Sequence, residues 1–113
     1  MADEEVSDVA LARKTADLAI VNGKIVNVHT AEIYPCDIAV KKDKIATVTD
    51  VRETIGKNTV VLDAKGKYVT PGLIEPHIHV AGSHLSMTEF ARVVMAHGTT
   101  AVATDFYEIG IVG

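Results

Sequence analysis

The sequence has 113 residues, of which 48% are hydrophobic and 23% charged, with a net charge of -4. This is the composition of a small globular domain, and it provides no basic surface for nucleic acid or for anionic membranes. No apolar run approaches the ~20 residues of a membrane span, and the acidic start differs from a secretory signal, so a cytoplasmic protein is expected. Cys36 is the only cysteine, which excludes a disulfide or a cysteine-rich zinc motif within the chain.

Residues 1–16 are expected to form a helical lead. Ser7 is the candidate helix cap, and a partial apolar stripe follows it at Val9, Leu11 and Ala12. Because this stripe is short and the segment is acidic, a frayed tail is the alternative interpretation.

Residues 17–70 are predicted to form short strands joined by turns. The pair Asn22-Gly23 lies between two apolar runs and predicts a hairpin, because a type I′ turn needs positive φ at both central residues. Further turns are predicted at Lys41–Lys44 and around Ala64–Gly66. Turn signals this close together favour a small antiparallel β-sandwich portion.

The character of the sequence changes at Pro71-Gly72, where a third segment, residues 71–113, begins. The run "LIEPHIHV", Leu73–Val80, is apolar apart from Glu75 and two histidines. A continuous apolar run is typical of a parallel strand that is buried on both faces. The sequence therefore predicts a buried strand here.

A helix and a second strand follow in the same segment. Ser86 and Glu89 have the spacing of a capping box, and Gly98 is placed to end the helix in the left-handed conformation. One face of this helix is predicted to carry Phe90, Val93 and Val94. The β-branched run Thr99–Thr104 then completes a strand–helix–strand unit with two parallel strands.

This arrangement is incomplete in itself. A parallel pair with one helix cannot cover both faces of its sheet, whereas parallel sheets are almost always covered on both. The strands of residues 17–70 also leave edges open to pairing. We therefore expect a second polypeptide or a longer parent chain to supply the remainder, and an oligomer in solution.

Two histidines are the strongest candidates for chemistry. His77 and His79 alternate onto one face of the predicted strand, with Cα atoms about 6.6 Å apart. Imidazole bonds to metals are about 2.0 to 2.1 Å long, so both rings can reach one cation such as Zn, Fe, Mn or Ni. The alternative is a pair of neutral histidines that are hydrogen-bonded in a core or at a surface edge. A catalytic zinc also needs at least three protein ligands, so the pair is half a site.

The other histidines and two carboxylates have open roles. His84 lies on a loop beyond the pair and faces either a pocket or solvent, whereas His97 beside a helix end and His29 in a turn are expected to be structural. Asp105 and Glu108 follow the second strand, at the edge where the histidines lie. A carboxylate there can orient a ligand histidine, hold a second ion or bind substrate. A helix N-cap is the alternative for Asp105.

With these residues identified, the sequence resembles the amino-terminal part of amidohydrolase-superfamily enzymes over residues 16–113. In that superfamily a small β-sandwich domain precedes a (β/α)8 (TIM) barrel. The stretch "PGLIEPHIH", residues 71–79, resembles the junction that leads into the first barrel strand and its His-x-His pair. Within the superfamily, residues 16–48 and 87–109 are most similar to bacterial adenine deaminases.

The resemblance implies a fold and a reaction. The fold is α/β, with an antiparallel β-sandwich portion followed by the first strand–helix–strand of an incomplete barrel. The reaction is metal-dependent hydrolysis, namely deamination of adenine to hypoxanthine and ammonia. His77 and His79 are the implied ligands of a divalent ion (Zn, Mn or Fe), with one or two ions in the centre. The remaining ligands and the catalytic aspartate belong to later barrel strands, so no catalytic residue is expected in this chain. Contacts to the substrate or to the metal ligands are expected from Ser83, His84, Asp105 and Glu108.

Two segments depart from the adenine deaminase pattern. Residues 81–83 are Ala-Gly-Ser where the family has Glu-Ser-Ser, and residues 105–108 are Asp-Phe-Tyr-Glu where it has Asp-Pro-His-Glu. Because both segments face the site in that family, hydrolysis of another purine or of a cyclic amide is the alternative. A non-catalytic structural or assembly subunit that retains the histidine pair is the alternative from a different class.

Overall fold

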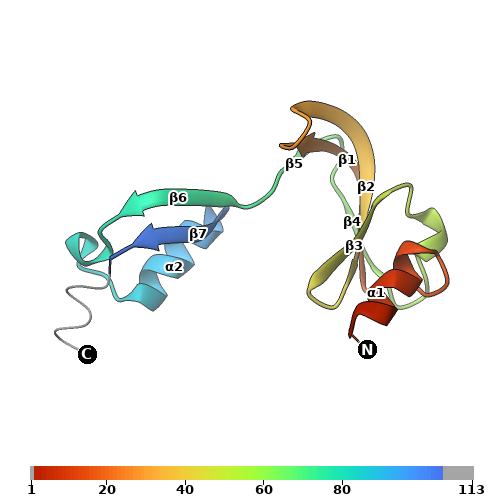
Figure 1. The fold of residues 1–113 in the computed structure, drawn as a ribbon, viewed down its shortest axis with the longest axis horizontal. Helices are drawn as coiled ribbons and strands as arrows, with labels where there is room; N and C mark the ends of the chain where they lie inside the picture. Colours follow the sequence, from red (N-terminus) through yellow and green to blue (C-terminus); the bar gives the residue numbers. More distant parts are fainter. Residues whose placement is uncertain (1, 106–113) are drawn as a thin grey trace. The chain divides into compact units, whose positions relative to one another are not determined.

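The computed structural model describes residues 2–105, and the chain divides into two compact units with the boundary between Thr70 and Pro71 (Figure 1). None of the helices within residues 2–105 is long and apolar enough to cross a membrane. The first unit contains α1 (Ala2–Ala10), β1 (Leu18–Asn27), β2 (Glu32–Lys41), β3 (Lys44–Thr49), the 3-10 helix η1 (Arg52–Thr54), β4 (Val60–Asp63) and β5 (Tyr68–Val69).

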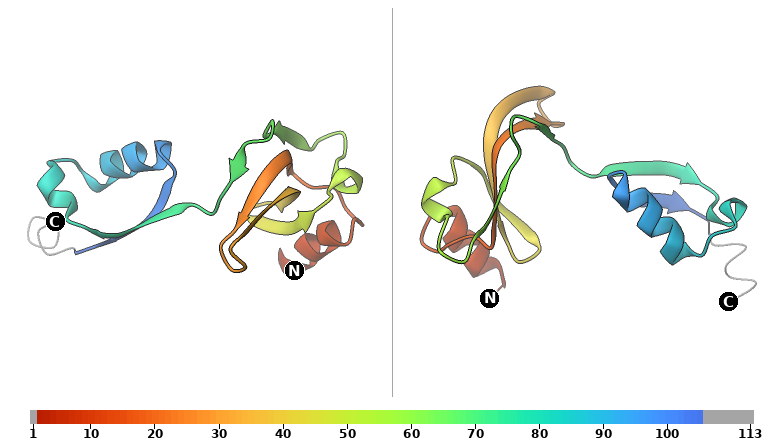
Figure 2. Two further views of the ribbon diagram at one scale, coloured as in Figure 1. Left: turned by 90° about the horizontal axis from the view of Figure 1, so that it is seen from above. Right: turned by 180° about the vertical axis from the view of Figure 1, so that it is seen from behind.

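The strands of the first unit form one mixed sheet in the order β3-β2-β1-β4, with β5 also paired to β1 (Figure 2). β2 is antiparallel to both β1 and β3, whereas β4 and β5 are parallel to β1. The antiparallel arrangement predicted for residues 17–70 is therefore wrong at this edge. β4 and β5 each pair with β1 and not with each other. The turn that joins them is therefore not a hairpin, because it connects two strands that lie along the same neighbour.

The hairpin predicted at Asn22-Gly23 is also wrong, because β1 continues through this pair. The register of β1 against β2 shifts between Ile20 and Gly23, and Asn22 has a φ of 58°. The backbone N–H of Asn22 donates to Asp37 Oδ1 (2.9 Å), and its side-chain amide donates to Asp63 Oδ1 (2.9 Å). The left-handed residue thus creates a β-bulge that is anchored on both neighbouring strands instead of a chain reversal.

The other two predicted turns are present. The turn at Lys41–Lys44 joins β2 to β3 as an antiparallel hairpin, as predicted, and Lys42 has a φ of 55°. Its backbone N–H donates to Asp17 Oδ2 (2.8 Å). At Ala64–Gly66 the chain turns through Gly66, with a φ of 75°, but it joins β4 to β5 and makes no hairpin.

α1 packs on β2 and β3 and closes a small core. Val9 is fully buried as its stripe predicted, whereas Leu11 is 59% exposed. Ser7 lies inside the helix, which already begins at Ala2, so its predicted role as the cap is wrong. The helix ends well before residue 16, and Ala12 has a φ of 54°. The buried cluster consists of Val9, Ala16, Ala19, Ala39 and Val51.

The second unit confirms the predicted strand–helix–strand motif. It contains β6 (Leu73–Ile78), the 3-10 helix η2 (Val80–Ser83), α2 (Met87–Ala96) and β7 (Thr99–Thr104). β6 and β7 pair in parallel, and α2 packs against β7 (Figure 1). The two strands therefore end at the same edge of their sheet.

α2 begins and ends where the sequence predicts. Ser86 is its N-cap, and its hydroxyl accepts a hydrogen bond from the backbone N–H of Glu89 (3.3 Å). The Glu89 carboxylate binds Arg92 instead (2.8 Å). Of the two hydrogen bonds of a capping box, the structure therefore shows the one that the Ser86 hydroxyl accepts. Gly98 follows the helix with a φ of 92°. Phe90 is buried, but Val93 is 53% exposed, so the predicted apolar face is only partly covered.

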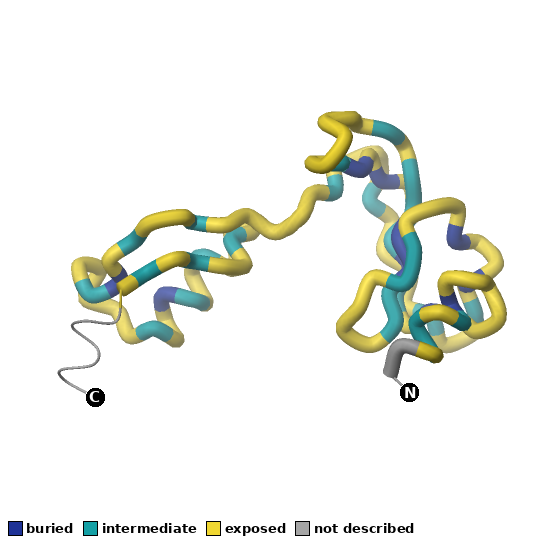
Figure 3. The backbone as a smooth tube through the Cα atoms, viewed as in Figure 1, coloured by how far each residue is buried: buried dark blue, intermediate teal, exposed yellow. Residues whose placement is uncertain are grey.

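The strand predicted over Leu73–Val80 is shorter and more exposed than expected. β6 ends at Ile78, because the chain turns into η2 from Val80. Leu73 and Ile74 are 58% and 70% exposed, and Figure 3 colours most of β6 as exposed. Within residues 71–105, α2 is the only α-helix, and burial of both strand faces is not observed.

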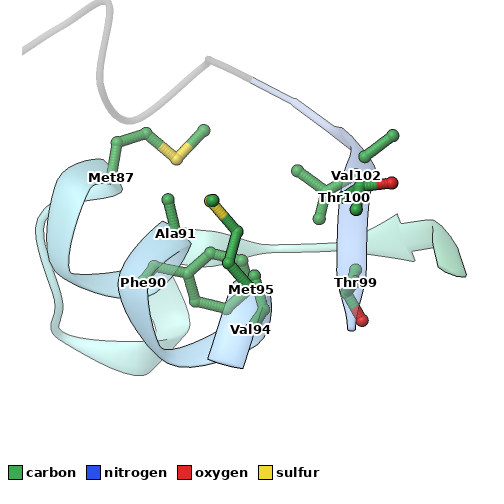
Figure 4. Close-up of a pocket in the computed structure, with 9 residues that line it drawn as sticks. Met87, Phe90, Ala91, Val94, Met95, Thr99, Thr100 and Val102 are labelled. Atoms are coloured by element: carbon green, nitrogen blue, oxygen red, sulfur yellow. The ribbon is translucent and has the colours of Figure 1, made fainter. Parts of the chain in front are cut away.

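An apolar groove of about 210 Å³ runs between α2 and β7. Figure 4 shows Met87, Phe90 and Met95 from the helix facing Val102 from the strand. The residues that line it include no histidine, cysteine or acidic residue, so the groove is not a candidate centre for acid–base or metal chemistry.

Candidate metal centre

The end of β6 brings two imidazole rings together. His77 is the penultimate residue of β6, and His79 directly follows the strand. Because every second residue of an extended chain points to the same side, the two side chains share one face. Their Nε2 atoms are 3.1 Å apart, their ring centroids are 4.9 Å apart, and their planes meet at 76°. The two nitrogens that would bind a metal therefore converge on one point.

A carboxylate that follows the neighbouring strand contacts His79. Asp105 directly follows β7, and the register that pairs Ile78 with Thr104 places it beside His79. Its Oδ2 atom lies 3.1 Å from His79 Nδ1. This contact between residues far apart in the sequence arises because β6 and β7 run in parallel and end at the same edge.

The site is open to solvent on this chain. It lies in a depression of about 320 Å³ formed by the ends of β6 and β7. The side chains of His79 and Asp105 are 63% and 56% exposed. A ligand can therefore reach both rings without any movement of the described residues.

The donor atoms fit a divalent metal ion. Two nitrogens bound to one ion at about 2.0 to 2.1 Å, with an angle between 90° and the tetrahedral value, lie about 2.8 to 3.4 Å apart. The observed Nε2–Nε2 separation of 3.1 Å falls in that interval. Within residues 2–105 no three histidine, cysteine or acidic side chains are placed to hold one metal ion together, so the described part provides two imidazole donors.

Two further predicted site residues lie apart from the histidine pair. Ser83 donates its hydroxyl hydrogen to the carbonyl of Val80 (2.6 Å) and stabilises η2. His84 ends η2 with a φ of 58° and is exposed, and its backbone N–H donates to Ala81 (3.1 Å). Neither makes a hydrogen bond to the histidines. Glu108 lies outside the described residues.

The remaining histidines occupy the local positions expected of them. His97 follows the end of α2, where its backbone N–H donates to the carbonyl of Val94 (3.1 Å). His29 lies in the turn after β1, and its backbone N–H donates to Asn27 Oδ1 (3.0 Å). Both are exposed.

Glu75 is a contact of the site that we did not single out from the sequence. Its Oε1 accepts a hydrogen bond from the backbone N–H of His77 (3.0 Å) and so fixes the chain just before the pair. The signal was available in the alternation of the strand, because Glu75, His77 and His79 are spaced by two residues.

The segment that carries this geometry also carries a family match. Residues 60–105, which include β6, α2, β7 and Asp105, match the model described as "Amidohydrolase family". The matched family is the amidohydrolases.

The amidohydrolase match agrees with sequence relatives over nearly the whole chain. The chain is 47% identical to adenine deaminase from Moorella thermoacetica over 105 residues, which are 93% of this chain and 18% of the relative. It is 47% identical to adenine deaminase 3 from Rhizobium meliloti over 104 residues, or 90% of this chain and 18% of the relative. The chain thus spans about a fifth of the length of the curated relatives it matches.

Solved structures agree with the amidohydrolase match at the level of the fold. A D-aminoacylase variant in complex with copper chloride superposes with a TM-score of 0.66 and 27% identity, over 80% of this chain and 18% of that one. N-acyl-D-glutamate deacylase from Bordetella bronchiseptica, complexed with zinc and a phosphonate inhibitor, gives 0.61 and 26%, over 78% and 18%. The mixed α/β fold of this chain is shared with these hydrolases.

Proposed function

We propose that this chain is the amino-terminal part of a metal-dependent amidohydrolase that hydrolyses adenine to hypoxanthine and ammonia. The observation that carries the proposal is the convergence of His77 Nε2 and His79 Nε2, 3.1 Å apart, within the segment that matches the amidohydrolase family. Adenine is the preferred substrate because identity to adenine deaminases reaches 47%, against 27% for the deacylases of known structure.

In this proposal His77 and His79 hold a divalent ion through their Nε2 atoms. Neutral imidazole suits Zn, Mn and Fe, and a centre of one or two ions is compatible with the donors of this chain. A bound divalent ion supplies a water molecule of lowered pKa as the nucleophile for the ring carbon that bears the exocyclic amine. β6 carries His77 and leads directly into His79, and the Glu75 carboxylate accepts a hydrogen bond from the backbone N–H of His77.

Completion of the site requires residues beyond the two histidines. A catalytic zinc takes at least three protein ligands, and β6 and β7 alone do not form a covered parallel sheet. We assign the missing strands of a (β/α)8 barrel to a longer parent chain or to a second polypeptide. Substrate contacts are proposed at the carboxyl edge of β6 and β7, where barrel enzymes bind their ligands, from Ser83, His84, Asp105 and Glu108.

The test uses the intact polypeptide or complex that contains this chain. Metal content is measured by mass spectrometry, and ammonia release is measured with adenine, with a cyclic amide and with other aminopurines. Deacylation of an N-acyl-D-amino acid is followed in parallel. Replacing both His77 and His79 by Ala should remove the metal and the turnover, whereas His29→Ala and His97→Ala, at exposed histidines away from the pair, should retain both.

Each outcome separates the alternatives. Retention of metal in the variant that lacks both His77 and His79 would refute the ligand assignment. Turnover of another purine, a cyclic amide or the N-acyl amino acid in preference to adenine would transfer the proposal to that substrate class. An intact assembly that contains neither metal nor hydrolase activity would favour the structural subunit.

A further inference from the structure

The contact between Asp105 and His79 determines which ring nitrogen carries hydrogen. The Asp105 carboxylate has no hydrogen to donate, so the 3.1 Å contact between its Oδ2 and His79 Nδ1 requires an N–H at Nδ1. A neutral imidazole has one N–H. His79 Nε2 is then left with a free lone pair.

The second ring takes the complementary state. His77 Nε2 lies 3.1 Å from His79 Nε2, and two lone pairs do not face each other at that distance. Since His79 Nε2 is the acceptor, His77 Nε2 carries the hydrogen and donates it. With both imidazoles neutral, which is the form that binds a metal, the two rings are in different tautomers before any ion is bound.

We propose that Asp105 is a positioning residue that holds His79 in the Nδ1–H tautomer and so presets its Nε2 lone pair for a metal ion. This inference rests on the proposed function, because it takes His77 and His79 as the ligands. The two histidines therefore differ in how readily they bind a metal ion. His79 is ready to bind, whereas His77 must release its Nε2 hydrogen to water and gain one at Nδ1 from water, with no net change in charge.

The fold explains why this carboxylate, and not another, has the role. Parallel pairing of Ile78 with Thr104 places the residue after β7 beside the residue after β6. Glu75 is the comparable carboxylate on the strand itself, but it binds the backbone N–H of His77 and not a ring nitrogen. It is the matched control, since it has the same charge and lies beside the same histidine pair without binding either ring nitrogen.

The experiment measures zinc affinity and tautomer in the intact polypeptide or complex that contains this chain. Zinc affinity is measured by chelator competition for the wild type, Asp105→Ala, Asp105→Asn and Glu75→Gln. Loss of an outer hydrogen-bond partner of a ligand histidine typically costs ~10- to 100-fold in metal affinity, which is the decrease expected for Asp105→Ala. Asp105→Asn should recover most of the loss, because its amide oxygen accepts the same hydrogen bond. Glu75→Gln removes the charge but keeps an oxygen that accepts the hydrogen bond from the His77 backbone, so it should match the wild type.

A second measurement reads the tautomer without zinc. Histidine labelled with ¹⁵N distinguishes protonated from unprotonated ring nitrogens, and the metal-free wild type should show His79 protonated at Nδ1 and His77 at Nε2. Asp105→Ala should shift the His79 signals toward the other tautomer. This measurement needs no folded variant, because the wild-type spectrum alone is decisive.

The failures are distinguishable. If the wild type binds no zinc, or binds it equally well without His77 and His79, the proposed function fails. If zinc binds through the pair but Asp105→Ala has unchanged affinity, the inference on Asp105 is overturned. Equal losses in Asp105→Ala and Glu75→Gln would reveal a general effect of charge and would overturn it too, as would a wild-type His79 protonated at Nε2.

Discussion

Gly72 directly precedes β6 and packs against Thr100 of β7, and we expect its replacement by alanine to force the two strands apart. A methyl group at this position would lie 2.8 Å from Thr100 Cβ and would also collide with both Thr100 Cγ2 and Oγ1. Rotation of the threonine side chain leaves the Cβ contact unchanged, so the backbone has to move. Overpacking of this kind typically costs ~1 to 3 kcal/mol.

Gly82 provides the matched control for the same chemical change. A methyl group there would meet no atom within 4 Å, and Gly82 is not among the glycines with positive φ. Gly82→Ala should therefore be neutral or stabilising by up to about 1 kcal/mol, through the reduced entropy of the unfolded chain. Of the two glycine-to-alanine changes, only the one at Gly72 is expected to destabilise the protein.

Hydrogen exchange measured by mass spectrometry reads this difference in a protein of any size. The backbone N–H of Leu73 donates to the carbonyl of Gly98 (2.9 Å) and reports on separation of the strands. A cost of 1 to 3 kcal/mol corresponds to roughly 5- to 150-fold faster exchange in Gly72→Ala. In a Thr100→Gly background the same substitution should have a much smaller effect. Exchange as slow as in Gly82→Ala, or an equal effect in both backgrounds, would refute the reasoning.

Three further predictions concern single hydrogen-bonding groups. Ser86→Ala removes the N-cap of α2 and should lower the free energy of unfolding by ~1 kcal/mol, measured by urea denaturation. Thr59→Val keeps the shape but removes two hydrogen bonds of the hydroxyl, at 2.7 and 2.9 Å, and should cost ~1 to 3 kcal/mol in the same assay. Hydrogen bonds from the Lys41 ammonium and then from the Lys42 backbone lower the pKa of Asp17 below its ordinary value of 3.8. Asp17 therefore stabilises the fold above pH 3.8, and this contribution is lost as the pH falls through the folded-state pKa, so Asp17→Asn should weaken the acid dependence of the melting temperature.

Local signals predicted the second unit well. The Ser86 cap and Gly98 define α2 from both ends, and the β-branched run Thr99–Thr104 forms β7 as expected. These features depend on groups within a few residues of each other, so the sequence contains them directly. The exposure of β6 was not predictable in this way, because it depends on what else packs against the strand.

The first unit shows where local signals fail. An Asn-Gly pair favours positive φ, which Asn22 adopts, but both a hairpin and a β-bulge use that conformation. The decision comes from Asp37 and Asp63, which bind Asn22 from the strands on either side. Neither partner is near in the sequence. The parallel pairing of β4 and β5 with β1 also joins residues far apart in the sequence, so no local signal predicts it.

The candidate site was partly predictable because a strand repeats every two residues. That period places His77 and His79 on one face, as their ring contact reflects, while their role as metal ligands stays a prediction. Asp105 was among several candidates, and its contact with His79 depends on the register of β6 and β7. The sequence offers no local signal for that register.

The position of β1 in its sheet has a kinetic consequence. β1 pairs with β2 through residues as near in sequence as Asn27 and Glu32, but with β4 through distant residues such as Leu18 and Val60. Because closing a longer loop costs more entropy, the β1–β2 ladder is expected to form first and to provide the template for β4 and β5. Substitutions in the turn between β1 and β2 should then slow folding, whereas substitutions in β4 should mainly speed unfolding.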